Sequence, residues 1–237
     1  EDYKELNPTL FDFLCDNALN FYKTDENRIS KPANKFEIDN TKYLSTIDSF
    51  IKLNLISKDS TSLQLQALKI YQTLLQFQLK NSSQKVIIQT NIERLKFVKQ
   101  HANFDDLDSL YLQTLKIEKN ILSNSTTASL YDYEIAQVYV EQGQKYHRNS
   151  NENRWKLREA LELCDQIIKK SPNSTTAKNA QNLKAQIEQP SLQLIAENYI
   201  PVSQPSRILV TYKNLSFLEF RIYNLSKNDE EKLNKIY

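Results

Sequence analysis

The sequence predicts a mainly α fold of antiparallel helical hairpins, a tetratricopeptide-like α-solenoid, followed by a short β segment. Three observations predict it: apolar residues recur every three or four positions, glycine occurs once in 237 residues, and the apolar period becomes two after Pro190. We therefore expect a helical repeat-like domain over residues 1–189. Residues 190–237 would form the truncated N-terminal strands of a β domain.

The first apolar stripe predicts a helix with Asn7 as N-cap and Pro8 at the first helical position. A polar, proline-containing stretch over residues 23–40 predicts a long loop. A second stripe, from Tyr43 to Leu55, predicts a second helix.

Three further stripes follow with short polar connections between them. The third helix begins after Asp59 or Ser60, either of which can serve as its cap, and ends near the polar run "KNSS". The fourth carries an apolar stripe over residues 86–98 and the fifth over residues 107–122. Helices of similar length with short connections are typical of helical repeats.

The next hairpin fits the tetratricopeptide pattern most closely. "YDYEIAQVYVEQGQKY" carries the Leu-like, small and Tyr positions of a first helix, and "REALELCDQIIKKSPNS" carries the small, large and closing Pro positions of a second. The expected packing residues are Ile135, Ala136, Tyr139, Gly143, Ala160, Cys164, Ile167 and Pro172. The inserted "HRNSNENRW" breaks the usual period of about 34 residues, so helices that merely pack in pairs remain an alternative. A further helix, "STTAKNAQNLKAQIEQ", would cap the stack.

Period-two alternation near the C-terminus predicts strands. Residues 208–213 and 218–223 alternate in this way, and "KNLS" between them predicts a turn. Short strands with two free edges do not make a stable sheet alone. This segment must therefore pair with something or begin a larger β domain.

Composition excludes several classes of protein. A glycine content of about 7% is usual, and nucleotide-binding loops and hydrolase turns need several glycines at fixed positions. Thirty-one Lys and Arg against 29 Asp and Glu give a net charge of +2 without a basic stripe, so nucleic acid is not an expected partner. No apolar run approaches a membrane span of about 18 residues, and no cofactor motif occurs.

Candidate reactive residues are few. Cys15 and Cys164 are expected to be free, buried thiols, with a long-range disulfide as the alternative. His101 and His147 each stand alone, and a metal site needs three or four convergent ligands.

Two tyrosines raise a question of binding. Tyr131 and Tyr133 could line a peptide-binding groove, since tyrosine offers a large contact area at low entropy cost. Tyrosine at helical spacing is also common in cores, with its hydroxyl reaching solvent. Both alternatives stay open.

The two ends of the chain resemble one family. "QPSLQLIAENYIPVSQPSRILVTYKNLSFLEFRIYNL" resembles the first strands of the first macroglobulin-type β-sandwich in bacterial alpha-2-macroglobulin-like proteins. "PTLFDFLCDNALNFYKTDE" and "ISKPANKFEI" resemble the opening of long members, in which a helical, tetratricopeptide-like region precedes the β domains. The resemblance spans nearly the whole chain. It implies that the β ending begins a sandwich that continues beyond Tyr237.

The resemblance also implies a role in protease trapping, where a bait region is cleaved and, in many members, a Cys–Gln thioester captures the protease. The thioester motif reads Cys-x-Glu-Gln, and neither Cys15 nor Cys164 is followed by Glu-Gln at these positions. We therefore expect no thioester in these residues. Proteases would be partners only through the full-length protein.

The expected function is a non-catalytic protein-interaction scaffold at the N-terminus of such a protein. Its location would be the bacterial envelope, periplasmic or outer-membrane-associated, or the outside of the cell. An independent helical-repeat adaptor, or an assembly or uptake lipoprotein, is the alternative. An enzyme is not expected, because acidic runs such as "FDDLDS" are typical of helix starts rather than paired catalytic carboxylates.

Overall fold

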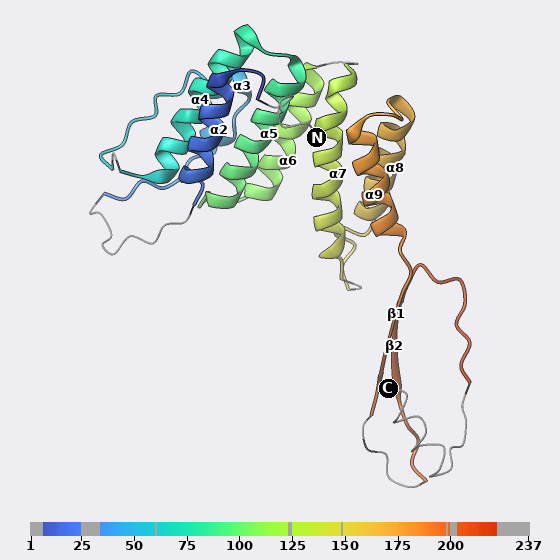
Figure 1. The fold of residues 1–237 in the computed structure, drawn as a ribbon. Coiled ribbons are helices and arrows are strands. Elements are labelled where there is room, and N and C mark those ends of the chain that lie inside the picture. The colour runs from blue at the N-terminus through green and yellow to red at the C-terminus, as the bar shows by residue number, and fades with distance from the viewer. Residues whose placement is uncertain are drawn as a thin grey trace, which may run out of the picture. The chain divides into compact units, whose positions relative to one another are not determined.

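The computed structural model describes residues 7–24, 34–59, 61–122, 125–147, 149–197, 199 and 203–221. Within these ranges the protein is mainly helical, with a short antiparallel pair of strands near the C-terminus (Figure 1). The predicted class, mainly α with a short β segment, is thereby confirmed. Contacts divide the chain into one compact unit over residues 1–187, the helical unit, and a second over residues 188–237, the β unit.

Helix α2 (Leu10–Tyr22) begins later than the sequence suggested, because a capping box sets its start. The Thr9 hydroxyl accepts a hydrogen bond from the Asp12 N–H at 3.2 Å, and the Asp12 carboxylate accepts one from the Thr9 N–H at 3.1 Å. The predicted N-cap, Asn7, is wrong, and Pro8 precedes the helix. Asn7 has an apolar residue three positions later, so it cannot form this reciprocal pair.

The predicted second helix over residues 43–55 is also wrong. The segment contains a 3₁₀ turn, η1 (Thr41–Leu44), and one short helical turn, α3 (Ile47–Phe50). From the last residue of α3 onward, three backbone carbonyls accept hydrogen bonds of 2.8–3.0 Å from the side chains of Gln72 and Gln76.

Side chains from later helices explain this departure. The consecutive carbonyls of residues 43–45 accept side-chain hydrogen bonds: Arg94 donates to the first and third, and Thr114 to the second, all at 2.8 Å. Glu118 accepts a hydrogen bond from the Ile47 N–H at 2.6 Å. A continuous α-helix would use these same groups in its own ladder, so the tertiary hydrogen bonds compete with it.

Three long helices follow where the sequence predicts them: α4 (Leu63–Asn81), α5 (Gln84–His101) and α6 (Leu107–Ile121). Neighbouring pairs of these helices pack against one another (Figure 1). Buried residues from all three belong to the core of the helical unit.

The N-cap of α4 is Ser62, whose hydroxyl accepts a hydrogen bond from the Leu65 N–H at 3.2 Å. Asp59, one of the two predicted caps, instead accepts a hydrogen bond from the backbone N–H of Phe36 at 3.1 Å. The other, Ser60, lies outside the described residues. Asp59 therefore ties the segment before η1 to the start of α4.

The last helices of this unit are α7 (Ser129–Gln144), preceded by the 3₁₀ turn η2 (Thr126–Ala128), then α8 (Lys156–Lys170) and α9 (Thr175–Glu188). Helices α7 and α8 share the most extensive contact between any two elements in the described ranges. They form the hairpin that the sequence pattern indicated.

The β unit contains an antiparallel ribbon of β1 (Ser191–Ala196) and β2 (Ile208–Lys213). The strand predicted over residues 208–213 is correct, but the strand predicted after the "KNLS" turn is not found over residues 218–221. Residues 214–221 form no strand, and 222–223 lie outside the described residues. The register with β1 aligns apolar side chains across the two strands, which favours this pairing.

Candidate interaction groove and the predicted hairpin

The residues predicted to pack the hairpin belong to its core, with one exception. Ala136 and Ala160 are fully buried, on α7 and α8 respectively. Small side chains at such positions allow two helices to approach closely. Buried with them are Ile135, Tyr139, Gly143, Cys164 and Ile167.

Gly143, near the end of α7, allows the closest approach in the hairpin. A Cβ built at this position would lie 2.7 Å from Leu157 Cγ and 3.1 Å from the Leu157 backbone nitrogen. Any side chain here would therefore push the start of α8 away from α7.

Pro172 is the exception, because it is exposed. It lies just beyond the end of α8, whose last helical residue is Lys170 and whose C-cap is Ser171. Proline cannot continue a helix, so this position fits the predicted role in ending it.

The two candidate groove tyrosines lie in different environments. Tyr131 is fully buried, and its hydroxyl accepts a hydrogen bond from Asn91 Nδ2 at 2.8 Å. It is a core residue and presents no surface to a ligand. Tyr133 is partly buried and lines the groove described next.

A groove of about 520 Å³ lies along one side of the helical unit. Its lining comes from α2, α4, α5, α7 and the first turns of α9. Apolar side chains, including Leu19, Leu74 and Ile92, alternate with amides and charges. A second hollow of about 540 Å³ shares Lys96, Glu134 and Gln137 with the first.

Three ion pairs lie among the residues that line the two hollows, and each joins a lysine to a glutamate on another element. Lys96 Nζ lies 2.7 Å from Glu134 Oε1, between α5 and α7. Burial raises the pKa of Glu134, although the neighbouring Lys96 acts in the opposite direction. The other two pairs are Lys23–Glu93 at 3.5 Å and Lys99–Glu141 at 2.8 Å.

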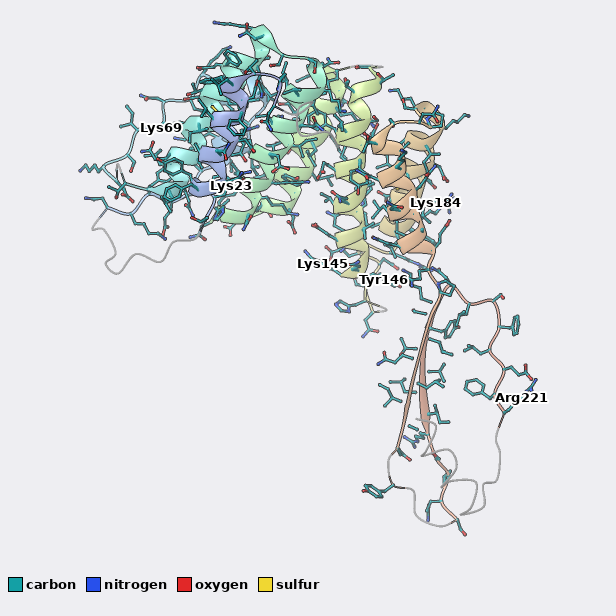
Figure 2. All side chains as sticks on the ribbon, in the orientation of Figure 1. Lys23, Lys69, Lys145, Tyr146, Lys184 and Arg221 are labelled. Atoms are coloured by element: carbon teal, nitrogen blue, oxygen red, sulfur yellow. The ribbon has the colours of Figure 1, made fainter. Side chains whose placement is uncertain are left out.

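Three polar atoms of groove residues have no hydrogen-bond partner among the described residues: Tyr71 Oη, Gln78 Oε1 and Gln89 Oε1. Tyr71 and Gln78 are each only 1% exposed. Lys23, at the end of α2 (Figure 2), holds its ammonium over the Tyr71 ring, 5.5 Å from the centroid. Burial raises the pKa of Tyr71 well above its usual range, so its hydroxyl keeps its proton.

A buried polar network separate from the groove centres on Arg94, which is fully buried. Besides its two backbone acceptors, Arg94 donates to Asn91 Oδ1 at 2.9 and 2.7 Å, and its guanidinium lies 4.2 Å from the ring centroid of Phe50. Burial lowers the pKa of Arg94 to about 10, which leaves it charged at neutral pH. Burial has the opposite effect on the carboxyl group of Glu118 and raises its pKa.

Sequence reasoning did not single out this network or the groove amides. A signal for the network was present, since Asn91 and Arg94 interrupt an apolar stripe at positions that face the core. No comparable signal marked Gln78 or Gln89, because glutamine is ordinary on exposed helix faces.

The remaining candidate residues are the two cysteines and the two histidines. Cys15 and Cys164 are free thiols, as predicted, but only Cys164 is buried, and Cys15 is partly exposed. Burial raises the pKa of Cys164 to about 11. No group of His, Cys, Asp and Glu side chains that could hold a metal ion occurs among the residues that the structure places. None of the helices within the described ranges is long and apolar enough to cross a membrane.

The β ribbon presents a second candidate surface. Antiparallel partners share a face, so the register separates its residues into two sets. One face is mixed and includes Ser191, Lys213, Gln193 and Thr211. The other is entirely apolar apart from one hydroxyl and consists of Leu192, Leu194, Ala196, Ile208, Val210 and Tyr212. Leu192, Leu194, Ile208 and Tyr212 are about half exposed or more.

Comparison with known proteins found no match to this chain among family models, curated proteins or solved structures.

Proposed function

We propose that this chain is a non-catalytic protein-interaction scaffold at the N-terminus of a bacterial alpha-2-macroglobulin-like, protease-trapping envelope protein. The observation that carries the proposal is the ribbon, which follows the helical unit directly and exposes an apolar face. A face of this kind is what one layer of a β-sandwich presents to the other. The amino-acid sequence of residues 189–225, which resembles this family, supports the same proposal.

The groove supports the interaction role. Its lining combines apolar and polar side chains, which could contact an extended segment or a helix of another protein. Proteases would meet this region only in the context of the full-length protein. The proposed location is the periplasm, the outer membrane or the outside of the cell.

An independent helical-repeat adaptor, such as an assembly or uptake lipoprotein, is the second candidate. One observation favours it: the helical unit has its own continuous core and forms a compact unit by itself. The two proposals assign different roles to the β unit. In the family proposal it contains the first strands of a β-sandwich, whereas an independent adaptor would not need such strands.

The natural gene product distinguishes the two candidates. An antibody raised against the helical unit would be used to blot envelope, cytosolic and secreted fractions of the parent cells. We expect the antibody to detect a polypeptide several times larger than this 237-residue chain in the envelope or secreted fraction. A band of about the length of this chain would overturn the family proposal and favour the adaptor.

A further inference from the structure

We infer that the helical unit binds an acidic polypeptide segment between α6 and α8, where lysine side chains from both helices lie over α7. This inference rests on the proposed interaction role and names the chemistry of the partner. The surface, which we call the lysine trough, is defined by Lys116 and Lys119 on α6 and by Lys156 and Lys170 on α8. Because these lysines come from two helices, they form no basic stripe in the sequence.

Helix α7 forms the floor of the lysine trough, since it lies between α6 and α8 and contacts both (Figure 1). At one end, Lys116 Nζ lies 5.5 Å and Lys156 Nζ 4.4 Å from the centroid of the Tyr139 ring. Ammonium groups from two different helices are thus held over one aromatic ring. Their mutual repulsion weakens when an anion binds between them, which favours binding of a carboxylate.

The other end of the lysine trough is a hollow of about 560 Å³. Lys119 forms an ion pair there with Asp132 of α7, and Lys170 Nζ donates a hydrogen bond to the Ser125 carbonyl at 2.9 Å. Two amides and two apolar side chains complete the described lining: Asn120, Gln166, Ala128 and Ile167. This hollow therefore offers both charged and apolar contacts to a bound segment.

The charge of the lysine trough indicates an acidic partner. Asp132 and Glu159 each pair with one of its four lysines. Lys116 and Lys170 are exposed, and neither forms an ion pair with a residue that the structure describes. Four lysines against two carboxylates leave two positive charges in excess, and both are accessible to a partner in solution.

A polypeptide suits the lysine trough better than a nucleic acid does. Both excess charges are lysine ammonium groups, and the described lining contains no arginine, whose planar guanidinium binds phosphate in a bidentate way. Nucleic-acid binding depends on neutralising several successive phosphates, and the excess here is two charges. Single carboxylates of acidic side chains are therefore the better match.

The length of the lysine trough suits a short segment. Tyr139 and Asp132 mark its two ends and are seven residues apart on α7, a rise of about 10.5 Å. Four residues of extended chain span about 13 Å. One short segment that carries two acidic residues can therefore reach the lysines at both ends.

The test uses two displayed libraries of blocked peptides of about ten residues, both selected on the intact chain. One library is rich in aspartate and glutamate, and the other contains no charged residue. Dissociation constants of the selected acidic peptides are then measured for the wild-type protein, Lys116→Gln and Lys170→Gln. We expect each variant to bind about twofold to fivefold more weakly, the effect of one exposed charge pair.

Both variants should fold as the wild type does, which circular dichroism would check. Neither substitution breaks an ion pair with a described residue, and glutamine at position 170 keeps an N–H donor for the Ser125 carbonyl. The matched control is Lys80→Gln, an exposed lysine in the last turn of α4 that has no ion pair with a described residue. This control should leave the affinity unchanged.

Salt and peptide substitutions test the charge pairing directly. Raising the salt concentration from about 50 to about 500 mM should weaken binding to wild type, and should weaken it less for Lys116→Gln and Lys170→Gln. Replacing one acidic residue of a selected peptide by its amide should weaken binding to wild type but not to one of the two variants. Such coupling would show which carboxylate contacts which lysine.

The outcomes separate this inference from the proposed function. Acidic peptides that bind all variants equally would overturn the lysine trough but leave an interaction role at another surface. Binding peptides from the uncharged library alone would overturn the acidic partner. A single-stranded DNA oligonucleotide that binds more tightly than the acidic peptides, and loses affinity in the same variants, would overturn the polypeptide partner. Recovery of no peptide from either library would count against both this inference and the interaction role.

Discussion

The helical unit and the β unit differ in the burial of their apolar residues. In the helical unit, apolar side chains from every long helix are buried in one continuous core. In the ribbon, every residue is exposed or only partly buried, including the apolar face. Burial of apolar surface is the main driving force of folding. The helical unit therefore has the means to fold alone, and the ribbon does not.

Backbone hydrogen bonding shows the same contrast. Helices satisfy their interior N–H and C=O groups internally, and the irregular segment between residues 40 and 55 obtains partners from Arg94, Thr114 and Gln72. The ribbon has two strands, so each pairs along one side only within the described residues. Two-stranded ribbons are at best marginally stable alone, and a further layer or strand would complete this one.

The largest expected effect is loss of Arg94. Arg94→Ala removes four hydrogen bonds and leaves the buried Glu118 carboxylate without its neighbouring positive charge. We expect the free energy of unfolding to fall by about 3–5 kcal/mol, measured by urea denaturation followed by helical circular dichroism.

The matched control for this substitution is Arg158→Ala, which removes an exposed pair with Glu162 one helical turn away. It should change stability by less than about 0.5 kcal/mol. Equal effects of the two substitutions would contradict a structural role for the buried network.

A middle-sized effect should distinguish the buried core of the helical unit from the exposed ribbon. Ala136→Leu and Ala160→Leu insert bulk at fully buried positions in the hairpin, and each should cost about 1–3 kcal/mol. Ala196→Leu in the exposed ribbon is the matched control and should change the stability of the helical unit by less than about 0.5 kcal/mol. Unchanged melting of both hairpin variants would show that the helices do not pack closely there.

A smaller effect concerns Glu134, whose folded-state pKa is raised by burial above the ordinary value of 4.5. The native state then binds a proton more readily than the unfolded state, so this group's contribution to stability falls as pH rises from 4.5 through the folded pKa. Glu134→Gln should remove that contribution. Melting temperatures of both proteins between pH 4.5 and 7 would test it, and an unchanged difference across this range would contradict the shift.

The smallest expected effect is removal of the β unit. A chain ending at Gln189 should remain soluble and strongly helical, and should melt cooperatively at the temperature of the full 237-residue chain. Differential scanning calorimetry of both proteins would measure this. A clearly lower or non-cooperative transition would show that the strands cover part of the helical core, and would remove the contrast between the units.

Much of the fold could be predicted from the sequence because helical periodicity is a local signal. The stripes of α4, α5, α6, α7 and α8 located these helices, and the tetratricopeptide pattern located the hairpin of α7 and α8. The candidate groove was harder to predict from the sequence. Of its two predicted tyrosines only Tyr133 lines it, since periodicity does not distinguish a side chain facing the core from one facing a groove.

The errors arose where distant residues decided local structure. Residues 43–55 have the apolar spacing of a helix, but Arg94 and Thr114 bind their carbonyls. Residues 218–221 have the alternation of a strand, but β1 is the partner of β2. In both cases the competing partner lies far along the chain, and local spacing contains no information about it.

The sequence by itself determined the mainly helical class and the change to strands after Pro190, because these follow from backbone preference and side-chain period. Only the tertiary structure decided which carbonyls Arg94 binds, which strand pairs with β2 and which glutamines line the groove. Those choices depend on hydrogen bonds between residues far apart in the chain. Such hydrogen bonds form only once the apolar faces have packed and brought their partners together.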